Sequence, residues 1–278
     1  MNYGGNSVNI LSDGTLMVDG GNAFGQVPRT EWETQIKPDR RNRVRFAMNS
    51  MVIKTPNANI LVDTGAGSKR TDQLKESHHI NGNKLIRNLK EVGLNARDID
   101  IVVLTHLHFD HSGGCTKLNR SGDAVPIYPK ARHIVQEKCW IEAVSPNERF
   151  QTIFHQDDFM PLEEKGLIEL VDGDSEIAPG VTLKVADGPS KGHQMVLVDM
   201  GSERIVFASD LIPTSHHLQA NFIAAADEFP NETLVQKKEL IDMAMREGWI
   251  IVFGHGQEHR SGYVEEWNGR PHLLPKEV

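Results

Sequence analysis

This sequence of 278 residues has few cysteines and few aromatic residues, and it has neither a long apolar run nor an excess of positive charge. The two cysteines, Cys115 and Cys139, cannot form a disulfide framework, and we expect both to be small buried side chains. No apolar run approaches the length needed to cross a bilayer. The first residues also lack the charged and apolar stretches of a signal peptide. These absences predict a cytoplasmic protein that does not enter a membrane.

The balance of charge also excludes some classes of partner. The formal net charge is −8, which argues against a nucleic-acid or anionic-membrane surface as the main partner. Aromatic residues make up 6% of the chain, so nothing indicates a platform for stacking bases. The hydrophobic fraction of 38% is enough for a substantial core, and a small molecule is the expected partner.

The order of apolar and polar segments predicts one α/β domain covering residues 1–278. Short β-rich runs end in polar turns, and amphipathic helices lie between them, so we expect sheets covered by helices. The expected hairpins span residues 51–65 and 194–210, the expected single strands span 98–106, 181–188 and 248–256, and the expected helices span 84–94 and 231–248.

Ligand-type side chains follow or precede several of these strands. His106, His193, Asp210 and His255 all stand at strand ends. In layered α/β folds the loops at strand ends carry functional groups on a rigid scaffold. We therefore expect these four side chains to share a site.

The stretch "HLHFDHSGG", residues 106–114, has the pattern of a metal site. In an extended segment, His106 and His108 point to the same side and can bind one ion. Asp110 and His111 lie just beyond, where the chain must turn, and can face a second ion. The two glycines that follow allow a sharp bend. Imidazole and carboxylate ligands suit zinc, iron, manganese or cobalt.

With this motif the chain resembles the metallo-β-lactamase superfamily, whose hallmark is H-x-H-x-D-H. The stretches "ILVDTGAG" (60–67), "GPSKGHQ" (188–194), "FASDLIP" (207–213) and "VFGHG" (252–256) look like further motifs of that family. The resemblance implies a single-domain, four-layer αβ/βα sandwich with the site at one edge between the sheets. It also implies a first metal bound by His106, His108 and His193, a second bound by Asp110, His111 and His255, and Asp210 bridging both.

Two departures from the family pattern affect the interpretation. "SKGH" stands where the family often has T-P-G-H, and true β-lactamases often have a cysteine where this chain has Asp210. Antibiotic hydrolysis is therefore not the first expectation.

Two other stretches resemble one branch of the superfamily, the quorum-quenching N-acyl-homoserine lactonases and methyl-parathion-hydrolase-like enzymes. They are "MVDGGNAFGQVPRTEW" (17–32) and "SDLIPTSHHLQ" (209–219). This similarity implies a hydrolase with two divalent metal ions, zinc before iron, manganese or cobalt, that opens a lactone or related ester. Asp110 would also relay a proton to the leaving alkoxide. Residues 1–45 resemble an arm that supports homodimers in relatives.

Some residues carry weaker signals, with a structural alternative in each case. Asp63 fits either an orienting partner of a ligand histidine or a structural turn. The predicted substrate contacts are two histidines after Asp210 and three phenylalanines, which are also typical of core packing. They are Phe24, Phe109, His216, His217 and Phe222.

Other activities of the superfamily remain alternatives. A phosphotriester hydrolase would use the same two metals. An iron-dependent sulfur dioxygenase would typically leave part of the second site unused, whereas all seven ligand positions are filled here. A nuclease would usually need a basic surface, which the acidic chain disfavours. A module that has lost its metals is disfavoured by the complete ligand set.

Overall fold

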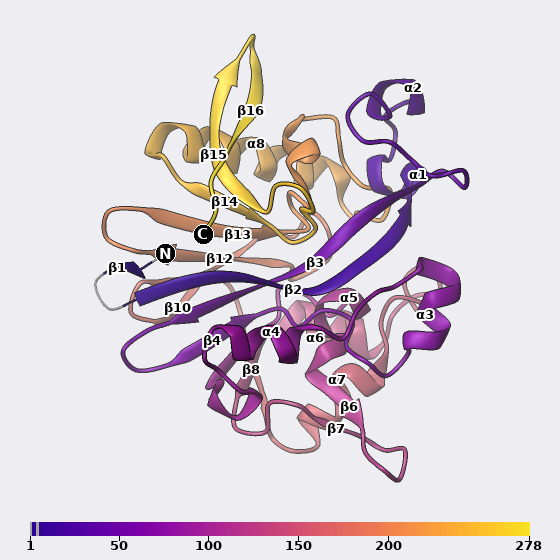
Figure 1. Cartoon of the computed structure of the whole chain (residues 1–278), viewed down its shortest axis with the longest axis vertical. Helices are drawn as coiled ribbons and strands as arrows, with labels where there is room; N and C mark the ends of the chain where they lie inside the picture. Colours follow the sequence, from indigo (N-terminus) through magenta and orange to yellow (C-terminus); the bar gives the residue numbers. More distant parts are fainter. Residues whose placement is uncertain (1, 4–5) are drawn as a thin grey trace.

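Two seven-stranded sheets form the centre of the protein (Figure 1). The structure is a computed structural model that describes residues 2–3 and 6–278. The first sheet has the strand order β1 (Asn2–Tyr3), β2 (Asn6–Asp19), β3 (Arg43–Lys54), β4 (Asn59–Val62), β5 (Ile101–Val103), β8 (Arg132–Gln136) and β9 (Ile168–Val171). The second has the order β10 (Ser175–Ala178), β11 (Val181–Val185), β12 (Gln194–Asp199), β13 (Arg204–Ser209), β14 (Ile250–Phe253), β15 (Ser261–Trp267) and β16 (Arg270–Pro275).

The helices lie outside this pair of sheets. The strands β6 (Thr116–Leu118) and β7 (Ala124–Pro126) form a separate two-stranded sheet. The α-helices are α1 (Gly20–Phe24), α2 (Arg29–Trp32), α3 (Thr71–His78), α4 (Leu85–Glu91), α5 (Phe109–Ser112), α6 (Glu137–Val144), α7 (Gln156–Glu163) and α8 (Pro230–Glu247). Three short 3₁₀ turns are η1 (Ala96–Asp98), η2 (Gly113–Cys115) and η3 (Ser215–Leu218).

Alternation along the central strands explains how the sheets pack. Successive side chains of a strand point to opposite faces. Ile60 and Ile205 therefore join the apolar cluster between the two sheets, while their neighbours Leu61 and Val206 face the outer layers. All four side chains are fully buried, so each central strand contributes to two cores.

Helices cover both outer faces. Leu85 and Leu89 of α4 pack on the first sheet together with apolar side chains of α6 and α7. Leu240 and Ile241 of α8 pack on the second sheet. Figure 1 shows the two sheets between α8 on one side and α4, α6 and α7 on the other. The predicted four-layer αβ/βα sandwich is confirmed.

Most elements expected from the sequence are present. The hairpin expected over 51–65 is β3–β4, the hairpin over 194–210 is β12–β13, and both are antiparallel. The helix expected over 231–248 is α8, which begins one residue earlier, at Pro230. It ends before Gly248, whose positive φ of 68° is typical of a glycine that follows a helix.

The long N-terminal hairpin β2–β3 was not among the expected elements. Its two strands pair over most of their length, with a bulge beside Gly14. Gly14 has a φ of 138°, and a Cβ atom there would lie 1.8 Å from the carbonyl oxygen of Asn81, so only glycine fits. In β3, the main-chain N–H groups of Ala47 and Asn49 donate hydrogen bonds to carbonyl oxygens in the turn after β14.

Two expectations drawn from composition can be compared with the described part of the chain. Cys115 and Cys139 are free and buried, as expected. Among residues 2–3 and 6–278, no helix is long and apolar enough to cross a membrane.

Candidate metal centre

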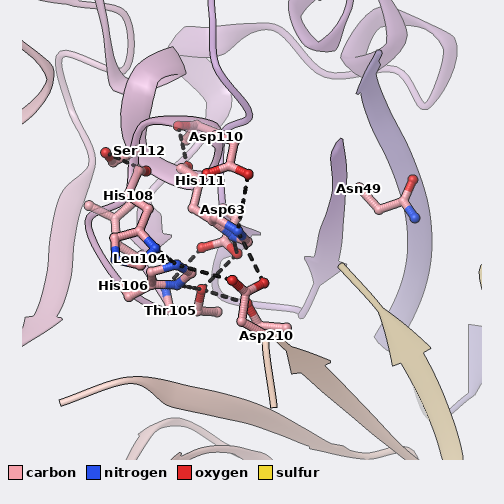
Figure 2. Close-up of polar contacts among 12 residues, drawn as sticks. Asn49, Asp63, Leu104, Thr105, His106, His108, Asp110, His111, Ser112 and Asp210 are labelled. Carbon is pink, nitrogen blue, oxygen red and sulfur yellow. Dashed lines mark hydrogen bonds and ion pairs between the residues drawn. The ribbon is translucent and has the colours of Figure 1, made fainter. Parts of the chain in front are cut away.

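The strand ends singled out in the sequence meet at one edge of the two sheets. β4 and β5 are parallel neighbours in the first sheet, and β13 and β14 are parallel neighbours in the second. Parallel neighbours end at the same edge, so His106, Asp210 and His255 emerge there. His193 directly precedes β12, which runs antiparallel to β13 and therefore starts at that edge. The predicted convergence of these four residues is what the structure shows, since His106, His193 and His255 all contact Asp210. Figure 2 shows His106 and Asp210 facing each other.

One helical turn, α5, brings in the rest of the motif. His108 is extended and precedes this turn, with φ −63° and ψ 151°. Its carbonyl oxygen accepts hydrogen bonds from the main-chain N–H groups of His111 and Ser112, both at 3.0 Å. The chain therefore turns where the sequence predicts, and His111 points toward Asp210.

The two glycines after the motif have a different role from the one expected. Gly113 has helical angles, φ −57° and ψ −30°, which any residue can adopt. A Cβ atom there would lie 2.5 Å from the Ala66 carbonyl oxygen, and one at Gly114 would lie 2.1 Å from that of Thr64. The glycines are needed because the loop after β4 packs directly against the motif, not because the chain bends sharply.

Asp210 lies between the histidines. Its Oδ2 is 3.5 Å from Nε2 of His106, and its Oδ1 is 3.0 Å from Nε2 of His255 and 3.3 Å from Nε2 of His111. Its main-chain N–H donates to Nε2 of His193 at 3.2 Å. His193 thus lies beside the centre, with its ring nitrogen directed at the main chain.

The remaining short distances define two overlapping groups. Nε2 of His106 lies 3.0 Å from Nδ1 of His108, and Nε2 of His111 lies 3.2 Å from Nε2 of His255. An oxygen of Asp110 is 3.9 Å from His255 and 4.0 Å from His111. Two sets of ligand-type atoms, each within 4.8 Å of one another, could therefore hold a metal ion: His106, His111 and Asp210, and Asp110, His111 and His255.

Main-chain carbonyl groups fix two of the rings from outside. Nδ1 of His255 donates to the carbonyl oxygen of Ala47 at 2.7 Å, and Nδ1 of His193 donates to that of Ala186 at 3.1 Å. A carbonyl oxygen can only accept, so Nδ1 carries the proton in each ring. In the neutral imidazole, Nε2 then carries a lone pair, which points toward Asp210 Oδ1 in His255 and accepts from the Asp210 main-chain N–H in His193.

A side-chain network fixes two further rings. Oδ2 of Asp63 accepts from Nδ1 of His111 and from the hydroxyl of Thr105, both at 2.8 Å. Because that hydroxyl proton goes to Asp63, Oγ1 of Thr105 accepts from Nδ1 of His106 at 3.1 Å and from Ser209 at 2.9 Å. Asp63 and Ser209 both have positive φ, 56° and 47°, at the ends of their strands. Of the two interpretations of Asp63, the orienting one agrees with this geometry.

These observations test whether a cation fits the centre. Nε2 of His111 and Nε2 of His255 lie 3.2 Å apart, a spacing that requires a proton or a metal ion between the two nitrogens. Oδ1 of Asp210 is buried and lies 3.3 Å and 3.0 Å from the same two nitrogens, so its negative charge faces that cation. A tetrahedral zinc ion keeps its ligand atoms about 3.4 Å apart, close to the spacings observed. The donor set therefore fits divalent metal ions.

The pKa values of the histidines around the centre also fit a site for metal ions. Burial lowers the pKa of His108 and of His193 to about 4, so both imidazoles are neutral at pH 7. Burial also opposes protonation of His111, but the carboxylates of Asp210, Asp63 and Asp110 together raise its pKa well above the usual value. The site therefore combines neutral ligands with a field that attracts positive charge.

The predicted substrate contacts fall into different environments. Phe24 and Phe222 are fully buried in an apolar cluster, where their rings make an edge contact at 5.6 Å. His217 is buried too: Nε2 donates to the Ala23 carbonyl oxygen at 2.9 Å, and Nδ1 lies 2.8 Å from Oγ1 of Thr214. The role of these three residues as substrate contacts stays a prediction.

Phe109 is buried in the same apolar cluster, whereas His216 is partly exposed. The ring of Phe109 is 5.3 Å from that of His78 and 6.0 Å from that of His155. His216 lines a cavity of about 490 Å³ together with His255. A larger cavity, of about 990 Å³, lies between the turn 25–28 and the segment 220–231.

Sequence analysis missed several residues that hold the centre in place. Thr105 and Ser209 each precede a predicted ligand, which was the available signal. The carbonyl groups of Ala47 and Ala186 had no signal, because a main-chain oxygen is the same in every residue. Asn49 was missed for the same reason, since its partners are main-chain carbonyl groups.

Comparison with known proteins places this geometry in a family. The sequence model described as "Metallo-beta-lactamase superfamily" matches residues 44–255, which is more than half of the chain. An N-acyl homoserine lactonase from Bacillus cereus is 27% identical over 234 residues, which cover 76% of this chain and 82% of that protein. A second, AttM from Azorhizobium caulinodans, is 27% identical over 175 residues, covering 61% and 63% of the two chains.

Solved structures agree over the whole chain. A probable metal-dependent hydrolase from Staphylococcus aureus has a TM-score of 0.90 at 26% identity, covering 100% of this chain and 99% of that one. AidC, a dizinc quorum-quenching lactonase solved with an N-hexanoyl-L-homoserine product, has a TM-score of 0.83 at 18% identity, covering 100% and 97%. The second likeness shows the fold alone.

Proposed function

Because this chain belongs to the metallo-beta-lactamase superfamily, we propose that it is a metal-dependent hydrolase that opens the ring of a lactone. The observation that carries the proposal is the set of Nε2 atoms of His106, His111 and His255 that converge on the buried carboxylate of Asp210. Such a set of ligand-type atoms attracts cations, and a divalent metal ion binds several of them at once. Relatives named as N-acyl homoserine lactonases indicate the class of ester.

The proposed ligand set has two parts. The first ion takes His106, His108 and His193, the second takes Asp110, His111 and His255, and Asp210 bridges both. The contacts of Asp210 with rings from both parts support the bridging role. The 3.0 Å distance between the ring nitrogens of His106 and His108 supports their sharing one ion.

The residues around the centre define what the site does. Two divalent ions held by these residues would make hydroxide available at neutral pH and would polarise the ester carbonyl group. Asp110 has a partly exposed side chain, and its carboxylate lies within 4.0 Å of two of the histidines. We assign to it the transfer of a proton from the attacking water to the ring oxygen as the ester bond breaks. The product is a hydroxy acid.

Zinc is the proposed metal. Imidazole and carboxylate groups also accept iron, manganese and cobalt, so elemental analysis of the purified protein is the test. A protein isolated with a single iron per chain and no zinc would favour the dioxygenase alternative.

The larger cavity suits the acyl arm of such a substrate. Val27, Ile223 and Leu234 line it, so an alkyl chain would lose contact with water there. Its wall also includes Asp227 and Glu228; the charge of Asp210 helps to raise the pKa of Asp227, and the charge of Glu228 opposes the lowering of the His108 pKa.

The proposal is tested by assaying zinc-loaded protein with N-acyl homoserine lactones of increasing chain length and with an aryl phosphotriester. We expect lactone hydrolysis that disappears on chelation and returns with metal, and a much lower rate with the phosphotriester. Metal-loaded protein that leaves every lactone intact would contradict the proposal.

A cytoplasmic homodimer is the proposed context. The arm formed by residues 1–45, which includes β2 and the start of β3, is the proposed dimerisation element. Light scattering at several protein concentrations tests the dimer, and cell fractionation tests the location. A monomer at all concentrations, or recovery outside the cytoplasm, would refute the respective part.

A further inference from the structure

The turn that carries His255 is attached to the N-terminal hairpin by one buried amide. Asn49 of β3 is only 3% exposed. Its Nδ2 donates to the carbonyl oxygen of Phe253 at 3.0 Å and to that of Gly256 at 2.8 Å. The two acceptors flank Gly254 and His255. One amide group therefore bridges both ends of the segment that carries the proposed metal ligand, His255.

Main-chain hydrogen bonds join the same two segments. The N–H of Asn49 donates to Gly254 O at 2.8 Å, and the N–H of Ala47 donates to His255 O at 3.1 Å. The ring of His255 returns a hydrogen bond to Ala47 O. The ligand turn therefore lies along β3, although the residues are more than 200 positions apart in the sequence.

The orientation of the Asn49 amide is determined by its partners. Both contacted atoms are carbonyl oxygens, which need donors, so the NH₂ group must face them. The other end, Oδ1, is buried without a partner among the described residues. An apolar side chain of similar shape would avoid that cost but would leave two buried carbonyl groups without donors.

The other rings at the centre are held by different groups. His111 and His106 depend on Asp63 and Thr105, which follow β4 and β5. Figure 2 shows Asn49 on a separate strand, away from the Asp63 network. A change at Asn49 should therefore act on His255 and leave the Asp63 network in place.

We propose that Asn49 is a positioning residue that fixes His255 for the second metal ion by spanning its turn. The inference rests on the proposed function, because it assumes that His255 is a metal ligand. Losing an outer partner of a metal ligand typically weakens metal binding by roughly 10- to 100-fold. The effect should be confined to one of the two ions.

Metal titration of Asn49→Asp against a chromophoric chelator tests this directly. Aspartate has nearly the shape of asparagine but cannot donate. We expect the wild type to bind two zinc ions tightly, and Asn49→Asp to bind one with unchanged affinity and the other roughly 10- to 100-fold more weakly. The matched control is Asn88→Ala, since Asn88 Nδ2 also donates to a main-chain oxygen, that of Ser12 at 2.7 Å, but does so on α4. The control should bind both ions like the wild type.

Two further variants keep the result interpretable. If the new charge unfolds Asn49→Asp, then Asn49→Leu removes the donors without adding charge and should show the same selective loss. Asn49→Gln, which retains an NH₂ group, should recover part of the affinity. Asn49→Asp or Asn49→Leu with two tight ions would overturn the proposal, as would equal weakening of both ions in a folded variant. A wild type that binds no zinc would instead refute the proposed function.

Discussion

The histidines of the metal centre and the single buried histidine of a neighbouring aromatic cluster, His217, differ in how their nitrogens are used. In the metal centre, His111 gives one nitrogen to Asp63 and turns the other toward Asp210 and His255. In the neighbouring aromatic cluster, His217 uses both nitrogens, on Ala23 and Thr214, and stacks on Phe24 at 5.1 Å. Both rings are almost completely buried, so burial by itself does not distinguish them.

The charge around these two rings also differs, although a lowered pKa is not confined to His217, since burial lowers the pKa of His108 and His193 to about 4 as well. The carboxylates near His111 outweigh burial and raise its pKa well above the usual value. His217 has no carboxylate partner among the described contacts, and burial lowers its pKa to about 3. A buried imidazole becomes a metal ligand when one lone pair stays free and faces negative charge. Three variants test this comparison.

Asp210→Ala should have the largest effect, because it removes the charge from the centre. Both Asp210 oxygens contact histidine nitrogens, so we expect the loss of at least one bound metal ion and of lactone hydrolysis. The loss in metal affinity should exceed the roughly 100-fold that removal of an outer partner causes. Elemental analysis and a lactone assay measure both effects. Wild-type turnover in Asp210→Ala would show that the bridging assignment is wrong.

Asp227→Asn should change how stability depends on pH. Asp227 is buried and accepts from Thr233 at 2.6 Å, and burial raises its pKa to about 7 from an ordinary value of 3.8. The folded state thus holds the proton more tightly than the unfolded state. Its stabilisation is complete below pH 4 and is lost as the pH rises through 7, by at most about 4 kcal/mol.

Urea unfolding of metal-free protein at pH 4.5 and pH 7.5 measures this. We expect the wild type to lose stability relative to Asp227→Asn across that interval. Parallel pH profiles for the two proteins would show that Asp227 is not held in its neutral form.

His217→Phe should have the smallest effect and leave the metals unchanged. Phenylalanine keeps the stacking on Phe24 but leaves the Ala23 carbonyl oxygen without its donor, at a cost of about 1–3 kcal/mol. Urea unfolding and metal content are the measurements, and His216→Phe, at a partly exposed position, serves as the control. Unchanged stability together with a raised KM would show that His217 contacts substrate instead.

The layered α/β class and the cluster at the strand ends were predictable because their signals are local, whereas the four-layer sandwich was expected from the family resemblance. The spacing from His106 to His111 determines the metal motif. The attachments were not predictable. The pairing of His255 with Ala47 depends on a hairpin from the other end of the chain, and the acceptor is a main-chain atom. Phe24 and Phe222 show a further limit, because phenylalanine is typical both of a core and of a pocket wall, and the sequence alone does not distinguish the two.

The most direct test of the account is the number of zinc ions that the metal-free wild type binds in competition with a chelator. The account predicts two tightly bound ions per chain, with lactone hydrolysis restored as they bind. Binding of no zinc, or full hydrolysis without any metal, would contradict it.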